Sequence, residues 1–247
     1  MNGVRLVRTP LFVGQRRTMK HIRILAVLTG RAAPLGNSGK NSGIAKKRRI
    51  GMVAIGPTGL ADDEQGDTVH HGGPEKAIHH YPYDHYPRWS EEVSTTLLAC
   101  PGAFGENIST LGMTERDVCL GDIYRLGSAT VQVSQGRQPC WRLNHRFERP
   151  TMAREVQTTG RTGWYYRVRE PGVVAEGDDI VLLERPTAEW SIARVLDLLY
   201  RNTLDRDALR ALNESQYCPP SWRKLIERRL ATNVVEDWLS RLTGSTS

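Results

Sequence analysis

The chain has 247 residues, enough for one large domain or for one medium and one small domain. With 39% hydrophobic and 25% charged residues, it can bury a sizeable core, which excludes a compositionally disordered protein. No run approaches 18 consecutive apolar residues, and the sequence therefore excludes a membrane-spanning helix.

The net charge of +7 is concentrated at one end of the chain. Residues 1–50 contain 12 Lys or Arg and no Asp or Glu, whereas the remainder contains 22 basic and 27 acidic residues. A nucleic-acid-binding domain carries its basic residues on the folded face that meets phosphate. We therefore predict no nucleic-acid partner and no membrane partner, although the basic segment could attract an anionic, phosphate-bearing cofactor.

Residues 1–20 are predicted to be an N-terminal extension that need not be ordered. The Arg16-Arg17 pair vaguely resembles a twin-arginine signal, but the apolar stretch after it is short and contains Arg23. We expect a cytoplasmic protein. The four cysteines are widely scattered and form no C-x-x-C pair, so a disulfide framework is not expected.

The next 165 or so residues are predicted to be rich in short strands. Alternating apolar residues or turn signals favour strands at 22–28, 50–55, 163–168 and 180–184, with a hairpin formed by 121–127 and 129–135. The segment 75–98 has helical spacing of apolar and aromatic residues, interrupted by Pro82 and Pro87. The fold class is therefore mainly β, with flanking helices.

The residues after Pro186 have helical periodicity instead. We expect helices near 190–199, 208–213 and 221–230, with a fourth over 234–242. The predicted organisation is a β-rich domain at 21–186 and a C-terminal three-helix module at 187–247.

The segment from Val133 to Cys140 carries the most chemical information. A strand ends near Gln135, Gly136 permits a sharp turn, and Pro139 suits the first position of a short helix. A helix N-terminus and the nearby guanidinium of Arg137 both favour a thiolate at Cys140, which is a nucleophile and a soft metal ligand. The alternative is an inert, buried cysteine.

Four stretches occur here in the order and approximate spacing of MOSC domains: His71-Gly72-Gly73-Pro74, Phe104-Gly105-Glu106-Asn107, Gly121-Asp122, and Gln135-Gly136-Arg137-Gln138-Pro139-Cys140. Gly160-Arg161-Thr162-Gly163-Trp164 and the helical tail resemble the YiiM type within that family. The resemblance covers roughly residues 21–240. One departure is Gly136, where the family commonly has proline, so a looser turn is expected.

The resemblance implies a β-barrel-like MOSC domain that binds a molybdenum–pterin cofactor (Moco), with Cys140 as the metal ligand. Related proteins include the molybdenum cofactor sulfurase C-terminal domains. They also include the mitochondrial amidoxime-reducing component, which reduces N-hydroxylated compounds. YiiM-type proteins are associated with resistance to N-hydroxylated base analogues, a detoxification role.

Further residues are assigned to cofactor binding with an alternative beside each. Arg137 is the arginine expected to meet the cofactor. Backbone N–H groups of His71, Gly72 and Gly73 could approach a phosphate or pterin, or form only a tight turn. Asn107 is expected near the site in a structural role. Asp63 and Glu64 match an acidic loop of the family, but a solvated loop explains them nearly as well.

The histidines at 79, 80 and 85 are not assigned to zinc. They lack cysteine partners or a second His-x-x-His unit, and packing with neighbouring tyrosines and tryptophan is favoured.

The leading hypothesis is a molybdenum-dependent oxidoreductase that reduces small N-hydroxylated substrates. The chain has no flavin or haem signature, so a separate reductase must supply electrons. Two alternatives remain open: a sulfur carrier that uses a Cys140 persulfide, and a non-catalytic cofactor-binding protein. The oligomeric state is also open, with a homodimer among the options.

Overall fold

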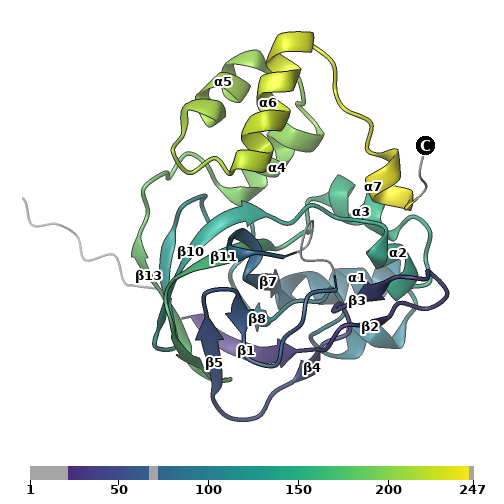
Figure 1. Ribbon diagram of the computed structural model, residues 1–247, viewed down its shortest axis with the longest axis vertical. Helices are drawn as coiled ribbons and strands as arrows, with labels where there is room; N and C mark the ends of the chain where they lie inside the picture. The colour runs from purple at the N-terminus through teal and green to yellow at the C-terminus, as the bar shows by residue number, and fades with distance from the viewer. Residues whose placement is uncertain (1–21, 67–71, 245–247) are drawn as a thin grey trace, which may run out of the picture.

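The computed structural model describes residues 22–66 and 72–244 of the chain, and its centre is a closed β-barrel (Figure 1). Within the described residues the ring has seven strands in the order β13-β9-β10-β11-β7-β8-β1, and pairing of β1 with β13 closes it. The strands are β1 (Ile22–Thr29), β7 (Ile78–Pro82), β8 (Ile108–Thr110), β9 (Ile123–Leu126), β10 (Ala129–Gly136), β11 (Trp164–Glu170) and β13 (Asp179–Glu184). The expected mainly β fold with flanking helices is confirmed.

The predicted hairpin is present as β9 and β10, paired antiparallel with Ala129 opposite Leu126. Its turn requires glycine, because Gly127 has a φ of +58° and a Cβ there would lie 2.3 Å from the carbonyl oxygen of Val173. The expected strands at 22–28, 163–168 and 180–184 correspond to β1, β11 and β13. The expected strand at 50–55 begins later, as β5 (Val53–Gly56).

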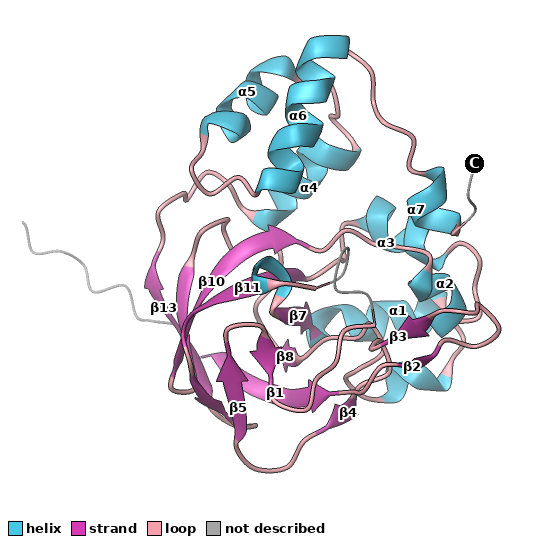
Figure 2. Cartoon of the chain, in the orientation of Figure 1, coloured by secondary structure: helices cyan, strands magenta, loops and turns pink. Residues whose placement is uncertain are grey.

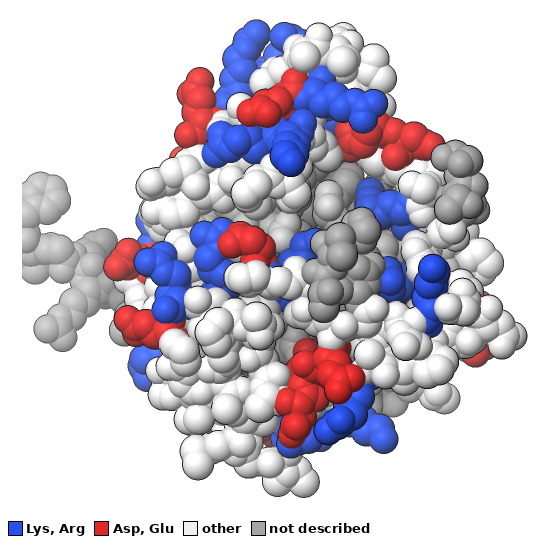
Figure 3. Space-filling view, in the orientation of Figure 1, with Lys and Arg blue, Asp and Glu red and all other residues white. Residues whose placement is uncertain are grey.

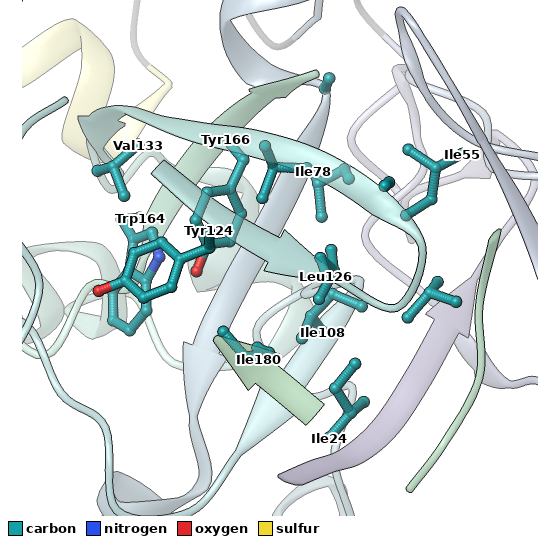
Figure 4. Close-up of a cluster of buried hydrophobic side chains, with 14 of the residues drawn as sticks. Ile24, Ile55, Ile78, Ile108, Tyr124, Leu126, Val133, Trp164, Tyr166 and Ile180 are labelled. Carbon is teal, nitrogen blue, oxygen red and sulfur yellow. The ribbon is translucent and has the colours of Figure 1, made fainter. Parts of the chain in front are cut away.

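Apolar side chains from every side of the ring meet in the barrel interior (Figure 4). Ile78, Ile108 and Leu126 are completely buried there, and Ile24 and Ile180 are nearly so. Removing this much apolar surface from water is the main stabilisation of the barrel. Shorter strands lie outside the ring: β2 (Ala33–Pro34), β3 (Asn41–Ser42), β4 (Lys47–Arg48), β6 (Gly59–Leu60) and β12 (Gly172–Val174).

Helices lie in two groups against the barrel (Figure 2). One group consists of α1 (Tyr86–Glu92), α2 (Arg142–Arg146), α3 (Met152–Thr159) and α7 (Leu239–Thr243), with the 3₁₀ turns η2 (Tyr83–His85) and η3 (Thr96–Ala99); a further 3₁₀ turn, η1 (Pro74–Lys76), packs on β10 and β11. The other group consists of α4 (Ile192–Tyr200), α5 (Arg206–Glu214) and α6 (Pro220–Thr232). In the described part of the chain no helix combines the length and apolarity that a bilayer crossing needs.

The expected helix over 75–98 is wrong in its first half, because residues 78–82 form β7 of the barrel. β7 pairs with β11 on one side and runs parallel to β8 on the other, and all five of its residues are buried. A strand that is buried on both faces shows no alternation of apolar and polar residues. The spacing of aromatic residues in this segment therefore resembles that of a helix. The helix expected over 234–242 is also shorter in the structure, where α7 spans only Leu239–Thr243.

Candidate functional site

The loop that carries Cys140 connects the end of β10 to α2. The N–H of Arg137 donates to the carbonyl oxygen of Gly163 at 3.1 Å, which ties the start of the loop to the strand β11 beside it. Two local expectations are wrong. Gly136 is the last residue of β10 rather than a turn, and α2 begins at Arg142, so Pro139 precedes the helix instead of opening it.

Gly136 is explained by close packing against α4. A Cβ at this position would lie 3.1 Å from Leu196 Cδ2 and 3.2 Å from Ile192 Cγ2. These distances are tighter than ordinary van der Waals contact, so a Cβ here would push the side chains of Leu196 and Ile192 aside by a few tenths of an ångström. The loop that follows is therefore anchored at its beginning rather than loosened.

Cys140 is 5% exposed and lines a polar cavity of about 80 Å³. Four basic residues and two acidic residues lie in its wall, which gives the cavity an excess of positive charge. The charged residues are Lys46, Lys76, Arg137, Arg142, Asp63 and Glu64, and the other polar wall residues include His79, Asn107 and Tyr165. The thiol thus borders a polar space that favours an anion, and it is not enclosed in apolar packing.

Arg137 is the most constrained of these cations. It is 6% exposed, and its Nη1 has no hydrogen-bond partner among the described residues. Burial lowers the pKa of His79 well below its usual value, and the positive charge of Arg137 lowers it further. His79 is therefore a neutral imidazole, and the positive charge next to it is that of Arg137.

Asp63 organises the opposite side of the cavity. Its carboxylate pairs with Lys46 and accepts hydrogen bonds from the backbone N–H of Gly30 at 2.9 Å and from Asn107 Nδ2 at 2.8 Å. Burial lowers the pKa of Lys46, and the adjacent Asp63 opposes that shift. Glu64, its neighbour in sequence, is exposed. The acidic loop therefore separates into one buried structural carboxylate and one solvated carboxylate.

Asn107 connects three segments of the cavity wall. Its side-chain oxygen accepts from the N–H of His79 at 3.0 Å, and its Nδ2 donates to the carbonyl oxygen of Leu28 as well as to Asp63. These bonds join β7 and β1 at the edge of the cavity. The expected structural role near the site agrees with this geometry.

Comparisons with known proteins identify the family. Residues 67–181 match the MOSC domain, and residues 190–233 match the YiiM-like, 3-alpha helix domain. Protein YiiM of Escherichia coli (strain K12) is 37% identical over 208 residues, which cover 83% of this chain and 92% of YiiM. The chain belongs to the MOSC-domain family.

Two further relatives extend the comparison. The crystal structure of YiiM from Geobacillus stearothermophilus has a TM-score of 0.72 and 34% identity, covering 85% of this chain and 99% of that protein. A Gibberella moniliformis (strain M3125 / FGSC 7600) protein named "Reductase" is 41% identical over 175 residues, which cover 70% of this chain but 31% of that protein.

Of the residues expected to bind cofactor in this MOSC protein, Arg137 and Asn107 line the cavity beside Cys140. Gly72 and Gly73 lie just before η1 and are not among the cavity-lining residues, although Lys76 at the end of η1 is. His71 lies outside the described residues. The turn η1 that follows these glycines is bonded to β10, because the carbonyl oxygen of Glu75 accepts from Ser134 Oγ at 2.5 Å.

Sequence reasoning did not single out Lys46, Lys76, His79 or Tyr165 for the site. Lys46 was part of a basic run with no distinguishing context, and His79 was placed on the wrong type of element. His79 and His85 pack against the neighbouring Tyr81, with ring centroids 6.3 and 5.6 Å apart, whereas His80 packs against Trp164 of β11 at 4.3 Å and not against the neighbouring aromatic residues expected for it.

A larger cavity of about 490 Å³ lies between α4 and the helices α1 and α3, and it contains none of the predicted site residues that the structure describes. Its titratable groups are largely paired with one another or with neighbouring groups. His85 Nε2 lies 2.7 Å from Glu115, and Arg161 pairs with Glu92 and lies over the ring of Trp89. We place the candidate site at the smaller cavity, because the Cys140 thiol and the buried guanidinium of Arg137 meet there.

Proposed function

We propose that this MOSC protein is a molybdenum cofactor-dependent reductase of small N-hydroxylated compounds, with Cys140 as the protein ligand of the metal. MOSC domains are associated with molybdenum cofactor binding, and a homologue bears the name "Reductase". The observation that carries the proposal is the pairing, in one cavity wall, of the Cys140 thiol with the buried Arg137, whose Nη1 has no hydrogen-bond partner within the described residues.

The residues of the cavity fit such a cofactor by their chemistry. A thiol is a soft donor suited to molybdenum, and arginine and lysine suit a pterin phosphate. A buried guanidinium N–H without an acceptor is costly, and an anionic ligand would supply that acceptor. The cavity of about 80 Å³ is below the roughly 300–1,000 Å³ of a usual ligand pocket, so the wall must open to admit the whole cofactor.

Each wall residue has a distinct task in this proposal. Cys140 would hold the metal, and Arg137 and Lys76 would neutralise the negative charge of the cofactor. The neutral His79 would contribute a polar side chain to the wall without adding a further charge. Asp63 and Asn107 keep the loop and the strands in place. The bound cofactor would supply the two-electron chemistry that cleaves the N–O bond, and a separate reductase would supply the electrons.

The test is to replace Cys140 with Ala, with Cys100→Ser as the matched control because Cys100 is exposed and does not line the cavity. Both variants and the parent are purified from cells that make the cofactor, and molybdenum is measured by elemental analysis. We expect C140A to lose bound molybdenum by at least ~10-fold, since removing even an outer-shell group costs that much. Reduction of hydroxylamine by a low-potential dye should fall in parallel.

Each alternative gives a different result in the same samples. A sulfur carrier predicts parent protein without molybdenum but with a persulfide on Cys140, detectable by mass spectrometry. A cofactor-binding protein without catalysis predicts molybdenum in the parent and no turnover with any electron donor. Full molybdenum content and activity in C140A would refute the proposal.

A further inference from the structure

The C-terminal segment returns from the helical group to the loop that carries Cys140 (Figure 1). After α6 the chain descends from the helical group toward α3, and α7 packs against α3 beside α2 (Figure 1). Leu242 of α7 is buried in the hydrophobic cluster that also contains Leu143 and Phe147 of the α2 region. The last described residues are therefore part of the wall that supports the candidate metal ligand.

Polar contacts of α7 fall on both sides of Cys140. The guanidinium of Arg241 donates through Nη1 to the carbonyl oxygen of Pro139, and the carbonyl oxygen of Arg241 accepts from the N–H of Trp141 at 2.8 Å. Asn144 Nδ2 then donates to the carbonyl oxygen of Leu242 at 2.7 Å. The residues immediately before and after the cysteine are thus fixed by a single residue 101 positions later in the chain.

Arg241 is itself held in one orientation. Its Nη2 donates to Gln157 Oε1 of α3 at 2.6 Å, and its guanidinium lies 5.6 Å from the ring centroid of Tyr200 on α4. Arginine presents its donors in a planar fork, so one side chain can join Pro139 and Gln157 in fixed directions. The ring of Trp141 packs over Gly244, where a Cβ would lie 3.0 Å from Trp141 Cγ.

We propose that Arg241 is a positioning residue for Cys140, and that the C-terminal segment acts as a strap that fixes the metal-binding loop from outside the barrel. The proposal rests on the function proposed above for its consequence in metal binding. The positioning itself concerns only the thiol and its loop. Because the residues on both sides of Cys140 are already fixed, the loop loses less conformational entropy when the metal binds. Loss of the metal is therefore expected to be slower.

The test compares Arg241→Gln and Arg241→Lys with the parent chain, and uses Arg210→Gln as the matched control. Arg210 lies on α5 in the helical group of α4 to α6, is exposed, and pairs with Asp207 at 3.1 Å. The full-length proteins are produced in cells unable to make the cofactor, so that Cys140 is unliganded. Alkylation of each cysteine is followed by peptide mass spectrometry, together with amide hydrogen exchange.

In R241Q we expect alkylation of Cys140 and amide exchange over 138–144 to become roughly tenfold faster, because a hydrogen bond from a charged group changes a local opening equilibrium by about that factor. Cys218 and the amides of β10 are internal references and should not change. R241K should also react faster, since a single ammonium cannot replace the fork. R210Q should match the parent.

The proposal is overturned if R241Q alkylates at the parental rate, or if R241K behaves like the parent, which would show that the charge alone matters. It is also overturned if Cys218 and β10 accelerate as much as Cys140, because that pattern indicates general destabilisation. A second measurement follows molybdenum loss from the loaded proteins, which should be faster in R241Q. Failure of molybdenum to bind the parent would refute the proposed function and leave the alkylation result standing.

Discussion

Asp63 shows at the level of a single residue how the cavity wall is stabilised. Its carboxylate is the partner of a buried lysine and of two further hydrogen-bond donors. In Asp63→Ala, Lys46 would remain buried without its counter-ion, and Asn107 and Gly30 would each lose an acceptor. Breaking a buried ion pair in this way costs roughly 3–5 kcal/mol of unfolding free energy.

The neighbouring carboxylate supplies the control for that prediction. Glu64 is exposed, lies 3.6 Å from Arg31 and accepts from the N–H of Ala32. Exposed pairs contribute about 0–1 kcal/mol, so Glu64→Ala should be nearly neutral. Urea unfolding of both variants measures the difference, and equal midpoints would contradict the buried role of Asp63.

Site residues were predictable from the sequence where they lie close together in the chain. Cys140 and Arg137 are three residues apart, and both line the cavity. Asp63, Lys46 and His79 reach the same wall from separate segments, and nothing in their local context distinguishes them from surface charges or core histidines. Their association depends on the order β7-β8-β1 in the sheet, and Asn107, just before β8, bonds to both β7 and β1.

At the level of the element, β7 carries two histidines into the barrel wall. Burial lowers the pKa of His80 to about 3, and burial with the charge of Arg137 lowers that of His79 well below its usual value. In the unfolded chain both groups titrate near ~6.5. The unfolded state therefore binds protons that the folded state does not, and stability must fall as the pH decreases from about 6.5 toward 3.

The prediction is tested with His80→Gln, whose amide can still bond to Thr110 and Tyr166, the partners of the imidazole. As the pH falls from 6.5 to 5, the slope that each such histidine contributes increases from about 0.7 to about 1.4 kcal/mol per pH unit, because the unfolded group changes from half to almost fully protonated. Unfolding free energies of the parent and H80Q are measured across this range. The slope should be smaller in H80Q by up to that amount, whereas parallel curves would show that His80 is protonated in the folded protein. Burial raises the pKa of Glu106, which acts in the opposite direction but equally in both proteins.

Elements were predictable where one face of a strand is buried and the other is not. β9 alternates in burial up to the Gly127 turn, and β1 does so over its first residues, whereas β10 alternates in polarity although almost all of it is buried. β7 has no exposed face, so its residues Ile78 and His79 carry no such signal. The parallel pairing of β7 with β8 also depends on the long crossover through α1, which no local pattern indicates.

At the level of the whole molecule, the helical module and the barrel share residues. Ile192 and Leu196 of α4 belong to the hydrophobic cluster of the barrel interior, while Leu120 belongs to the cluster of the helices. Backbone hydrogen bonds also join the module to the barrel domain: the N–H of Leu120 donates to the carbonyl oxygen of Trp190, and the N–H of Ile192 donates to that of Val118. On the face in Figure 3, acidic and basic side chains are interspersed over both parts. We propose that the boundary near residue 186 separates two regions of one cooperative unit.

Leu196→Ala tests this coupling. Leu196 is 3% exposed and packs on Gly136 at the end of β10, so the substitution should cost about 2–5 kcal/mol. If barrel and module unfold together, the loss appears equally in the far-ultraviolet circular dichroism of the helices and in the hydrogen exchange of the barrel strands. Leu204→Ala, on the same module but 37% exposed, should change stability by no more than about 0.5 kcal/mol.

Two separate transitions in the parent, or a loss in L196A confined to the helices, would show that the module folds independently. That result would also remove the reason for glycine at position 136, because the space for a side chain is limited only while α4 stays in place. A single transition means instead that α4 restrains the strand from which the Cys140 loop departs. The loop is then held by the helical module at its beginning, through Leu196, and by Arg241 on either side of the cysteine.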